Sequence, residues 1–277
     1  MNKLTQAKRV QVIAALVEGN SIRATCRMTG VAKGTVLKLL VDLGSACAAY
    51  QDKTLRNLIC KRIQCDEIWS FCYAKEKNVP EEMKGKLGIG DVWTWTAIDA
   101  DTKLIVSYQV GDRSAIYARK FIDDLATRLA HRVQLTTDGY KAYLVAIEKA
   151  FGSEIDYAML DKMYTHTGGN GGGPARYSPG ACCGAVKKRI KGNPDMEKIS
   201  TSYVERQNLT MRMSMRRMTR LTNAFSKRIE NQSHAVALHF THYNFARVHQ
   251  TLRVTPAMEA GIADHVWSLE ELTGLLD

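Results

Sequence analysis

A single glutamate in a run of arginines is the first group in this sequence whose surroundings point to chemistry. Residues 203–220 read YVERQNLTMRMSMRRMTR, and Glu205 is the one acid among them. At about 100° per residue, a helix over this segment places Glu205 on one face with Asn208, Arg212 and Arg216, and buries valine and methionine on another. The positions three and four residues from Glu205 hold no basic residue, so the helix itself supplies no ion-pair partner.

The charge around Glu205 indicates a metal ion next to a polyanion. The span 187–228 is dense in lysine and arginine, and its acids are Asp195, Glu197 and Glu205. Such a cluster is typical of a nucleic-acid-binding surface, although a membrane surface or an acidic partner would also attract it. A carboxylate that faces a phosphate backbone is repelled unless a cation lies between them. We therefore predict a cation at the DNA backbone, with phosphate contacts from Arg212, Arg216, Arg217 and Arg220.

Two aspartates far from Glu205 in the sequence are candidates for the same site. Asp66 lies within a strand pattern, where a solvent-facing position would also explain it. Strand alternation turns Glu67 to the opposite face, so at most one of this pair is expected to serve the site. Asp138 ends a short strand before Gly139 and a helix, where capping is an equally good explanation. If these strands are neighbours, Asp66 and Asp138 approach each other and Glu205 reaches them from a helix packed on the sheet.

Three carboxylates in one place predict divalent cations. Oxygen ligands suit Mg²⁺ or Mn²⁺, and two such ions about 3.5–4 Å apart activate the attacking oxygen and stabilise the leaving oxygen in phosphodiester displacement. We expect Asp66, Asp138 and Glu205 to hold such a pair of ions. His239 and His242 are alternative metal ligands, but no cysteine or nearby carboxylate completes their set, which favours packing or DNA contact.

The elements that must position these residues form two parts. The sequence predicts an N-terminal helix-turn-helix with a turn at Gly30, which would present Lys33, Thr35 and Lys38 to DNA; a helical bundle that serves dimerisation is the alternative. After residue 61, alternating aromatic and β-branched residues predict three antiparallel strands, then a helix, a strand, a helix and a strand, which makes a mixed α/β domain. The expected division is a helix-turn-helix domain 1–50, a connector 51–60, a catalytic domain 61–250 ending in helices, and a tail 251–277.

Composition bounds the class of protein. The chain has 277 residues, a net charge of +11 and seven cysteines. An odd number of scattered cysteines is typical of reduced thiols in the cytosol. No apolar run approaches membrane-spanning length and no signal-peptide core is present, so we expect a cytoplasmic protein without a membrane partner. The glycine-rich stretch 168–184 lacks the Gly-Lys-Ser/Thr ending of a phosphate-binding loop and is expected to be a flexible loop.

Four sequence strings taken together resemble the DDE transposases of small bacterial insertion sequences. They are CDEIWSF, TTDGYKAY, SYVERQNLTMRMSMRRMTRLT and HYNFARVHQTLRVTPAMEAG. The resemblance runs from the N-terminal helices almost to the C-terminus, and Tyr-Val-Glu-Arg-Gln-Asn is its most specific part. It implies a ribonuclease-H-like core in which Asp66, Asp138 and Glu205 form the metal-binding triad, with Asn208 and Arg212 near the substrate phosphate. Relatives often carry an N-terminal cysteine zinc module, which this sequence lacks.

The resemblance implies an enzyme that binds the terminal inverted repeats of its element, cleaves DNA and transfers the freed strand to a target. Its partner would be double-stranded DNA in the bacterial nucleoid, and joining two ends would require a homodimer or a larger assembly. Two other classes remain. A DNA-binding regulator derived from a transposase would have no reason to keep three acids. A structure-selective nuclease of the same fold would need no sequence-reading helices.

Overall fold

The computed structural model describes residues 4–86, 88–164 and 182–277. Its helices are α1 (Gln6–Val17), α2 (Ile22–Thr29), α3 (Lys33–Thr54), α4 (Ala115–Arg128), α5 (Ala142–Phe151), α6 (Ser202–Ser214), α7 (Ile229–Thr241), α8 (Pro256–Glu259) and α9 (Leu269–Gly274). Its strands are β1 (Arg62–Cys72), β2 (Gly90–Asp99), β3 (Ile105–Gly111), β4 (Gln134–Thr137), β5 (Asp156–Tyr164) and β6 (Cys182–Lys191).

The strands form one mixed sheet in the order β3-β2-β1-β4-β5-β6. The first three strands are antiparallel, β4 runs parallel to β1, β5 runs parallel to β4, and β6 is antiparallel to β5. The expected mixed α/β class is confirmed, and so is the expectation that the first and fourth strands are neighbours.

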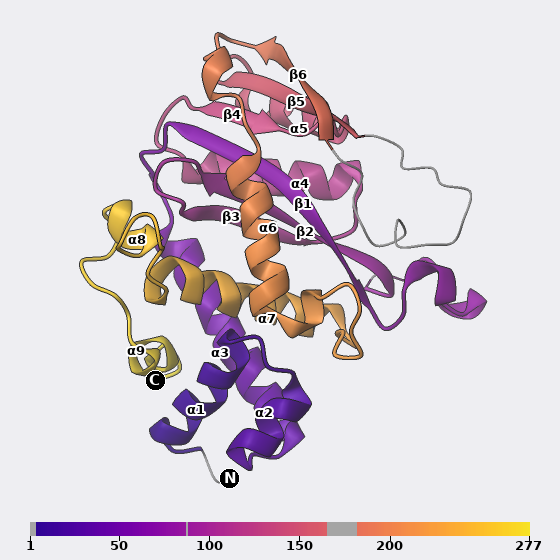
Figure 1. Cartoon of the computed structure of the whole chain (residues 1–277), viewed down its shortest axis with the longest axis vertical. Helices are drawn as coiled ribbons and strands as arrows, with labels where there is room; N and C mark the ends of the chain where they lie inside the picture. The colour runs from indigo at the N-terminus through magenta and orange to yellow at the C-terminus, as the bar shows by residue number, and fades with distance from the viewer. Residues whose placement is uncertain (1–3, 87, 165–181) are drawn as a thin grey trace.

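Helices cover both faces of the sheet (Figure 1). Ile63 and Cys65 of β1 pack in one apolar cluster with α4 and α5, whereas Ile68 and Cys72 belong to a second cluster with α3 and α7. Helix α6 crosses β1 on the side of this second cluster. The central strands are therefore covered on both faces, and most of β1 is buried although it carries Gln64, Asp66 and Glu67.

The N-terminal helices begin and end where the sequence predicts. Thr5 caps α1 and Ser21 caps α2 through their side-chain oxygens, and α2 ends at Gly30, whose φ of 70° suits glycine. The third helix differs from the prediction, because it continues for 22 residues to Thr54 instead of giving way to a separate connector at 51–60. Its buried positions recur every three or four residues as far as Gln51, so its packing against α7 reaches the first residue of the expected connector. The division into domains stays a prediction.

The crossing of α3 and α7 is unusually close at Gly44. A Cβ atom built there would lie 2.5 Å from both the Cβ and the carbonyl oxygen of His234. Only a residue without a side chain lets the two backbones approach this closely.

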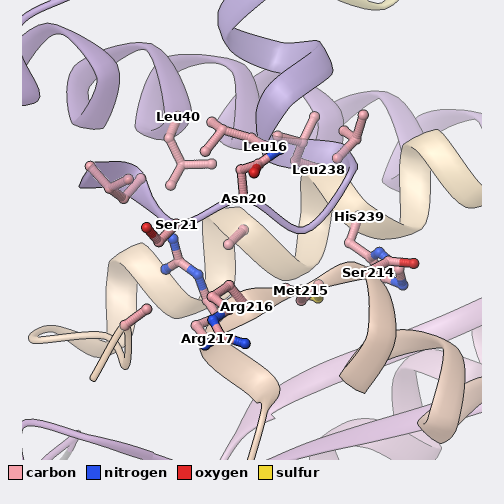
Figure 2. A pocket seen from close by; sticks show the side chains of 14 residues that line it. Leu16, Asn20, Ser21, Leu40, Ser214, Met215, Arg216, Arg217, Leu238 and His239 are labelled. Carbon is pink, nitrogen blue, oxygen red and sulfur yellow. The ribbon is translucent and has the colours of Figure 1, made fainter. Parts of the chain in front are cut away.

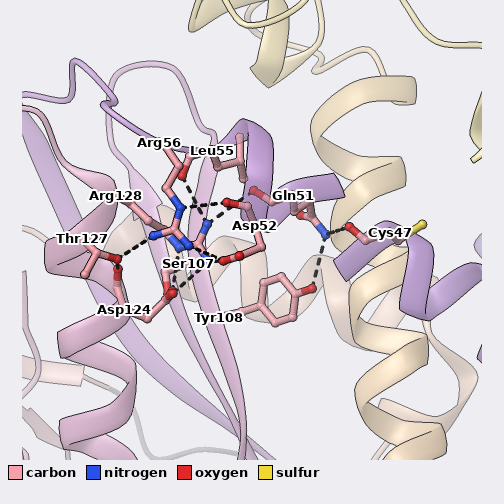
Figure 3. Close-up of polar contacts among 10 residues, drawn as sticks. All are labelled: Cys47, Gln51, Asp52, Leu55, Arg56, Ser107, Tyr108, Asp124, Thr127 and Arg128. Atoms are coloured by element: carbon pink, nitrogen blue, oxygen red, sulfur yellow. Dashed lines mark hydrogen bonds and ion pairs between the residues drawn. The ribbon is translucent and has the colours of Figure 1, made fainter. Parts of the chain in front are cut away.

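The far end of α3 is held by Arg128 of α4 (Figure 3). Its guanidinium donates to the carbonyl oxygens of Gln51 and Leu55, at 3.4 and 3.2 Å, and to the carboxylates of Asp52 and Asp124, at 2.9 and 2.7–2.8 Å. The buried Arg128 side chain thus satisfies carbonyl groups at the end of α3 and connects this helix to α4, which packs on the sheet.

Strand β6 lies at residues that no prediction assigned to a strand. Every side chain along it is exposed or partly exposed, and lysine and arginine dominate its second half, so it lacks the alternation that identifies a strand. The predicted flexible loop lies outside the described residues, except for 182–184, which belong to β6. The seven cysteines all lie in the described part of the chain and are unpaired. Within that part, no helix combines the length and the apolar character needed to cross a membrane.

Candidate active site

Two neighbouring parallel strands each deliver an aspartate at the point where their pairing stops. The β1–β4 register ends at Cys65 and Thr137, and the next residues are Asp66 and Asp138. Because β1 and β4 run in the same direction, the two carboxylates lie at the same end of the paired segment. The sequence-based expectation that Asp66 and Asp138 approach each other is met.

Glu67 joins these two acids, whereas strand alternation predicted that at most one of Asp66 and Glu67 would serve the site. One oxygen from each of Asp66, Glu67 and Asp138 lies within 4.8 Å of the others. Alternation does hold, since Glu67 shares its face with Ile63 and Cys65 on the side of α4 and α5. The prediction that only one of the two acids could serve the site failed because β4 has already ended beside Asp66 and Glu67. The carboxylate of Asp138 can therefore be approached from both faces of β1.

The electrostatics of this group are those of crowded, desolvated acids. Burial raises the pKa of Asp66 to about 7, and the charge of Asp138 adds to the shift. Burial likewise raises the pKa of Glu67 to about 8, with contributions from Asp138 and then Asp66. Burial also raises the pKa of Asp138. A divalent cation would reverse these shifts, because it favours the ionised form of each ligand.

Arg113 is the cation that the chain itself supplies. Its guanidinium lies 3.4 Å from Oε2 of Glu67 and 3.8 Å from Oδ2 of Asp138. The same group lies over the rings of Trp93 and Tyr140, 4.8 and 4.3 Å from their centroids, and the Tyr140 hydroxyl donates to the Arg113 carbonyl. The two rings and the two carboxylates fix Arg113 at the edge of the acidic group. Nothing in the sequence pattern singled it out.

Helix α6 is docked on β1 through two side chains of the strand. The Gln64 amide oxygen accepts from the main-chain N–H groups of Tyr203 and Val204 at 2.9 and 3.2 Å, and so caps the helix N-terminus. Two residues further along β1, Oδ2 of Asp66 accepts a 2.8 Å hydrogen bond from Asn208. Asn208, which is expected near the substrate phosphate, thus contacts one of the acids.

Glu205 reaches the same region but is not a member of the close group. Its Oε1 accepts a 2.6 Å hydrogen bond from the Thr201 hydroxyl and forms an ion pair with Lys162 of β5. The helix supplies no basic partner, as the sequence predicted; the partner comes from a strand about forty residues earlier, which local sequence cannot reveal. The charge of Glu205 still raises the pKa of both Asp66 and Asp138, so it lies within electrostatic reach of them.

The acids present suit a hard divalent cation. Opposite oxygen ligands of Mg²⁺ are separated by about 4 Å, since each Mg–O bond measures about 2.0–2.1 Å. Adjacent oxygens of an octahedral ion lie closer, at about 2.9 Å, so acids that now lie within 4.8 Å of one another would draw together by up to roughly 2 Å. One buried oxygen of Glu67 and the amide oxygen of Asn208 have no hydrogen-bond partner in the described structure, which leaves oxygen donors available at the site.

The helix predicted over 203–220 ends at Ser214, so the arginines that follow Glu205 do not form one continuous helical face. Some of them donate to groups within the protein, and others are exposed. Arg212 donates to the carbonyl oxygens of Met218 and Trp69, and the partly buried Arg217 donates to Ser226 and to the carbonyl of Asn231. Burial lowers the pKa of each to about 10. In the DNA-free chain Arg212 and Arg217 thus stabilise the turn after α6, while Arg216 and Arg220 are exposed.

A small cavity of about 40 Å³ separates this turn from the N-terminal helices (Figure 2). Asn20 and Ser21 line one side of it, and Met215 and Arg216 line the other. His239 also borders the cavity, and burial lowers its pKa to about 3, so its ring is neutral. The cavity lies apart from the acidic group, and His239 belongs to the packing of α7.

The predicted DNA-reading residues lie at the start of α3. Lys33, Thr35 and Lys38 are all exposed, and Lys38 pairs with Asp42 one turn later at 2.6 Å. The apolar positions between them, Val36 and Leu39, are buried against α1 and α2. The three predicted DNA-reading residues therefore lie on the solvent-exposed face of α3, opposite the face that packs on α1 and α2.

No protein-family model and no curated protein matches this chain. Similar solved structures include the Mos1 strand transfer complex and a pre-cleavage Mos1 transpososome, each at 11% identity and a TM-score of 0.24. The matches cover 56% and 57% of this chain and 59% and 60% of those chains, so they span about three fifths of the relatives. A TM-score of 0.24 is too low to assign a function, and the site's own residues must do so.

Proposed function

We propose that this chain is a DDE transposase of a bacterial insertion sequence, a metal-dependent enzyme that cleaves DNA at the ends of its element and joins them to a target. The observation that carries the proposal is the meeting of Asp66 and Asp138 at the ends of paired strands, with α6 docked across them by Gln64 and Asn208. If Asp66 and Asp138 had only a structural role, nothing would be gained by docking α6 beside them with Glu205 and further basic residues.

Each residue of the site has a proposed task. Asp66, Asp138 and Glu205 would hold two Mg²⁺ or Mn²⁺ ions, which when bound activate the attacking oxygen and stabilise the leaving one. Asn208 orients Asp66 through its 2.8 Å hydrogen bond. Glu205 must exchange Lys162 for a cation, and this would free the Lys162 ammonium for a phosphate oxygen.

The proposed reaction has two phosphodiester exchanges. In the first, water attacks the phosphorus at the element end, the bond to the 3′-oxygen breaks, and a 3′-hydroxyl and a 5′-phosphate result. In the second, that 3′-hydroxyl attacks a target phosphodiester, and the target's own 3′-oxygen leaves. The substrate is a polyanion throughout, which suits the exposed Arg216 and Arg220 beside the site.

DNA recognition is proposed for the other end of the molecule. Lys33, Thr35 and Lys38 project from the start of α3, the position of a recognition helix in a helix-turn-helix. They would read the terminal inverted repeats in the major groove. Joining two ends requires two sites, so the active form is proposed to be a homodimer or a larger assembly on DNA, working in the bacterial cytoplasm.

The test is cleavage and joining of a duplex that carries the terminal repeats, in Mg²⁺ or Mn²⁺. Asp66→Asn, Asp138→Asn and Glu205→Gln should each reduce cleavage to background while retaining repeat binding. Glu197→Gln is the matched control, because this exposed acid lies in the same basic span but outside the site. Cleavage that survives one of the three changes would remove that residue from the triad. Cutting of branched DNA without repeats, and without joining, would identify a nuclease instead.

A further inference from the structure

Glu67 has the features of a cation ligand although the proposed triad does not use it. The residue is 7% exposed, and one of its carboxyl oxygens has no hydrogen-bond donor in the described structure. The Tyr143 hydroxyl lies near enough to lower the pKa of Glu67, yet it makes no hydrogen bond of normal geometry. A buried carboxyl oxygen left without a donor is unfavourable, and neither water-exposed surface nor protein satisfies this one.

The charges near Glu67 leave room for one divalent ion. When ionised, Asp66, Glu67 and Asp138 carry three negative charges, and Arg113 contributes one positive charge. Two negative charges remain, equal and opposite to the charge of one Mg²⁺ or Mn²⁺ ion. The Arg113 guanidinium contacts Oε2 of Glu67, so the other oxygen is the one available to a cation.

Glu205 is neutralised separately in the same structure. Its carboxylate is paired with Lys162 and accepts from Thr201, so it contributes no uncompensated charge to the close group. The site therefore has a preassembled half, formed by β1 and the end of β4, and a second half that Glu205 contributes from α6.

We infer that Glu67 is a ligand of a cation site that it forms with Asp66 and Asp138, and that this site binds one divalent ion in the DNA-free protein without help from Glu205. The inference deepens the proposed function and rests on it for the identity of the metal. It differs from the triad in two ways: it adds a residue, and it divides cation binding into two steps.

Calorimetric titration of the full-length, DNA-free protein with Mn²⁺ tests the inference. We expect one ion per chain in the unaltered protein and in Glu205→Gln, with similar Kd. Glu67→Gln should raise Kd by at least about tenfold, since even residues behind a metal ligand cost 10–100-fold. Glu197→Gln is the matched control: this exposed acid is replaced in the same way but lies outside the site, and its loss should leave Kd unchanged.

A second variant guards against misfolding of Glu67→Gln. Glu67→Asp keeps the charge but shortens the side chain by one methylene, and it should also weaken Mn²⁺ binding, with folding checked by circular dichroism. An unchanged Kd in both Glu67 variants, beside a weakened Asp66→Asn, would reduce Glu67 to a partner of Arg113 and overturn the inference. Loss of binding in Glu205→Gln would do the same, because the site would then need Glu205.

The inference and the proposed function fail in different experiments. Cleavage of repeat DNA that requires Asp66, Asp138 and Glu205 but is accompanied by Glu67-independent Mn²⁺ binding supports the function and rejects the inference. Mn²⁺ binding that requires Glu67 in a protein that never cleaves DNA supports the cation site and rejects the enzyme. Absence of Mn²⁺ binding to the unaltered protein rejects the inference outright.

Discussion

Asn208 donates its side-chain N–H to Oδ2 of Asp66 at 2.8 Å, which joins the middle of α6 to the strand at the centre of the sheet. Glu205 lies one turn earlier on the same helix. Any shift of α6 therefore moves both the third acid and the group that orients the first.

Replacing Asn208 should impair catalysis more than folding. In Asn208→Ala, Asp66 loses its amide donor, and we expect a 10–100-fold fall in cleavage rate, the usual effect of removing a group that orients a metal ligand. Repeat binding should be preserved in a mobility-shift assay. Leu209→Ala, the next residue on α6 and exposed, is the control and should cleave normally. Equal loss in both variants would indicate general damage to the helix.

The acidic group should make the metal-free protein less stable as the pH rises. The pKa of Asp66 is about 7 in the fold and 3.8 in its ordinary state, so folding favours the protonated form. The stabilisation is complete below about pH 4 and is lost as the pH rises through about 7. Asp66→Asn cannot ionise, and it should therefore exceed the unaltered protein in unfolding free energy at pH 8, by up to roughly 4 kcal/mol, with the gain disappearing at pH 4.

Urea unfolding in a chelator at the two pH values measures this difference. Added Mn²⁺ should raise the Tm of the unaltered protein more at pH 8 than at pH 6, because the ligands must lose protons to bind. A stability gain in Asp66→Asn that is the same at both pH values would show that the charge of Asp66 is not its cause.

Two glycines of α3 should respond in opposite ways to alanine. At Gly44 the added Cβ meets the backbone of His234 at 2.5 Å, so Gly44→Ala should lower the unfolding free energy by about 1–3 kcal/mol, as overpacking does. At Gly34 a Cβ meets nothing within 4 Å, and Gly34→Ala should raise it by up to about 1 kcal/mol, as expected from helix propensity. Denaturant titration of both variants decides the matter, and equal effects would contradict the close crossing.

The exposed and internal arginines should separate in a salt titration of DNA binding. Arg216→Ala and Arg220→Ala each remove a proposed phosphate contact, and each should reduce the slope of log K against log salt concentration by about 0.9. Arg217 is partly buried and already donates to Ser226 and to the carbonyl of Asn231, so Arg217→Ala should lower the Tm without changing the slope. An unchanged slope for Arg216 and Arg220 would place the DNA elsewhere.

Much of the fold could be predicted because its signals are local. Thr5, Ser21 and Ser114 cap the helices that follow them, and the short turn between the alternating apolar residues of β2 and β3 identifies a hairpin before any contact is known. The aspartates could be found because an acid within or just after an apolar strand is unusual. Each of these signals can be recognised from residues that are close together in the sequence.

The features that escaped prediction depend on contacts between distant segments. Helix α6 ends at Ser214 without a glycine or proline to stop it. The turn at Gly19 packs against the last backbone atoms of the helix, where a Cβ atom on Gly19 would lie 3.1–3.3 Å away. The Arg212 side chain donates to the carbonyl oxygen of Met218 in the turn that follows. Lys162 becomes the partner of Glu205 only when β5 and α6 meet. Glu67 joins the acids only because β4 is short.

The unbroken course of α3 has a consequence for the DNA that such an enzyme could use. Its first turn carries Lys33 and Thr35, while its middle and end are fastened by Gly44 and Arg128, so no hinge separates the proposed reading surface from the acids. The number of base pairs between the recognised sequence and the severed bond is then set by the protein's own dimensions. Inserting about five base pairs, half a turn of duplex, would rotate the scissile phosphate to the opposite side of the double helix from the carboxylates.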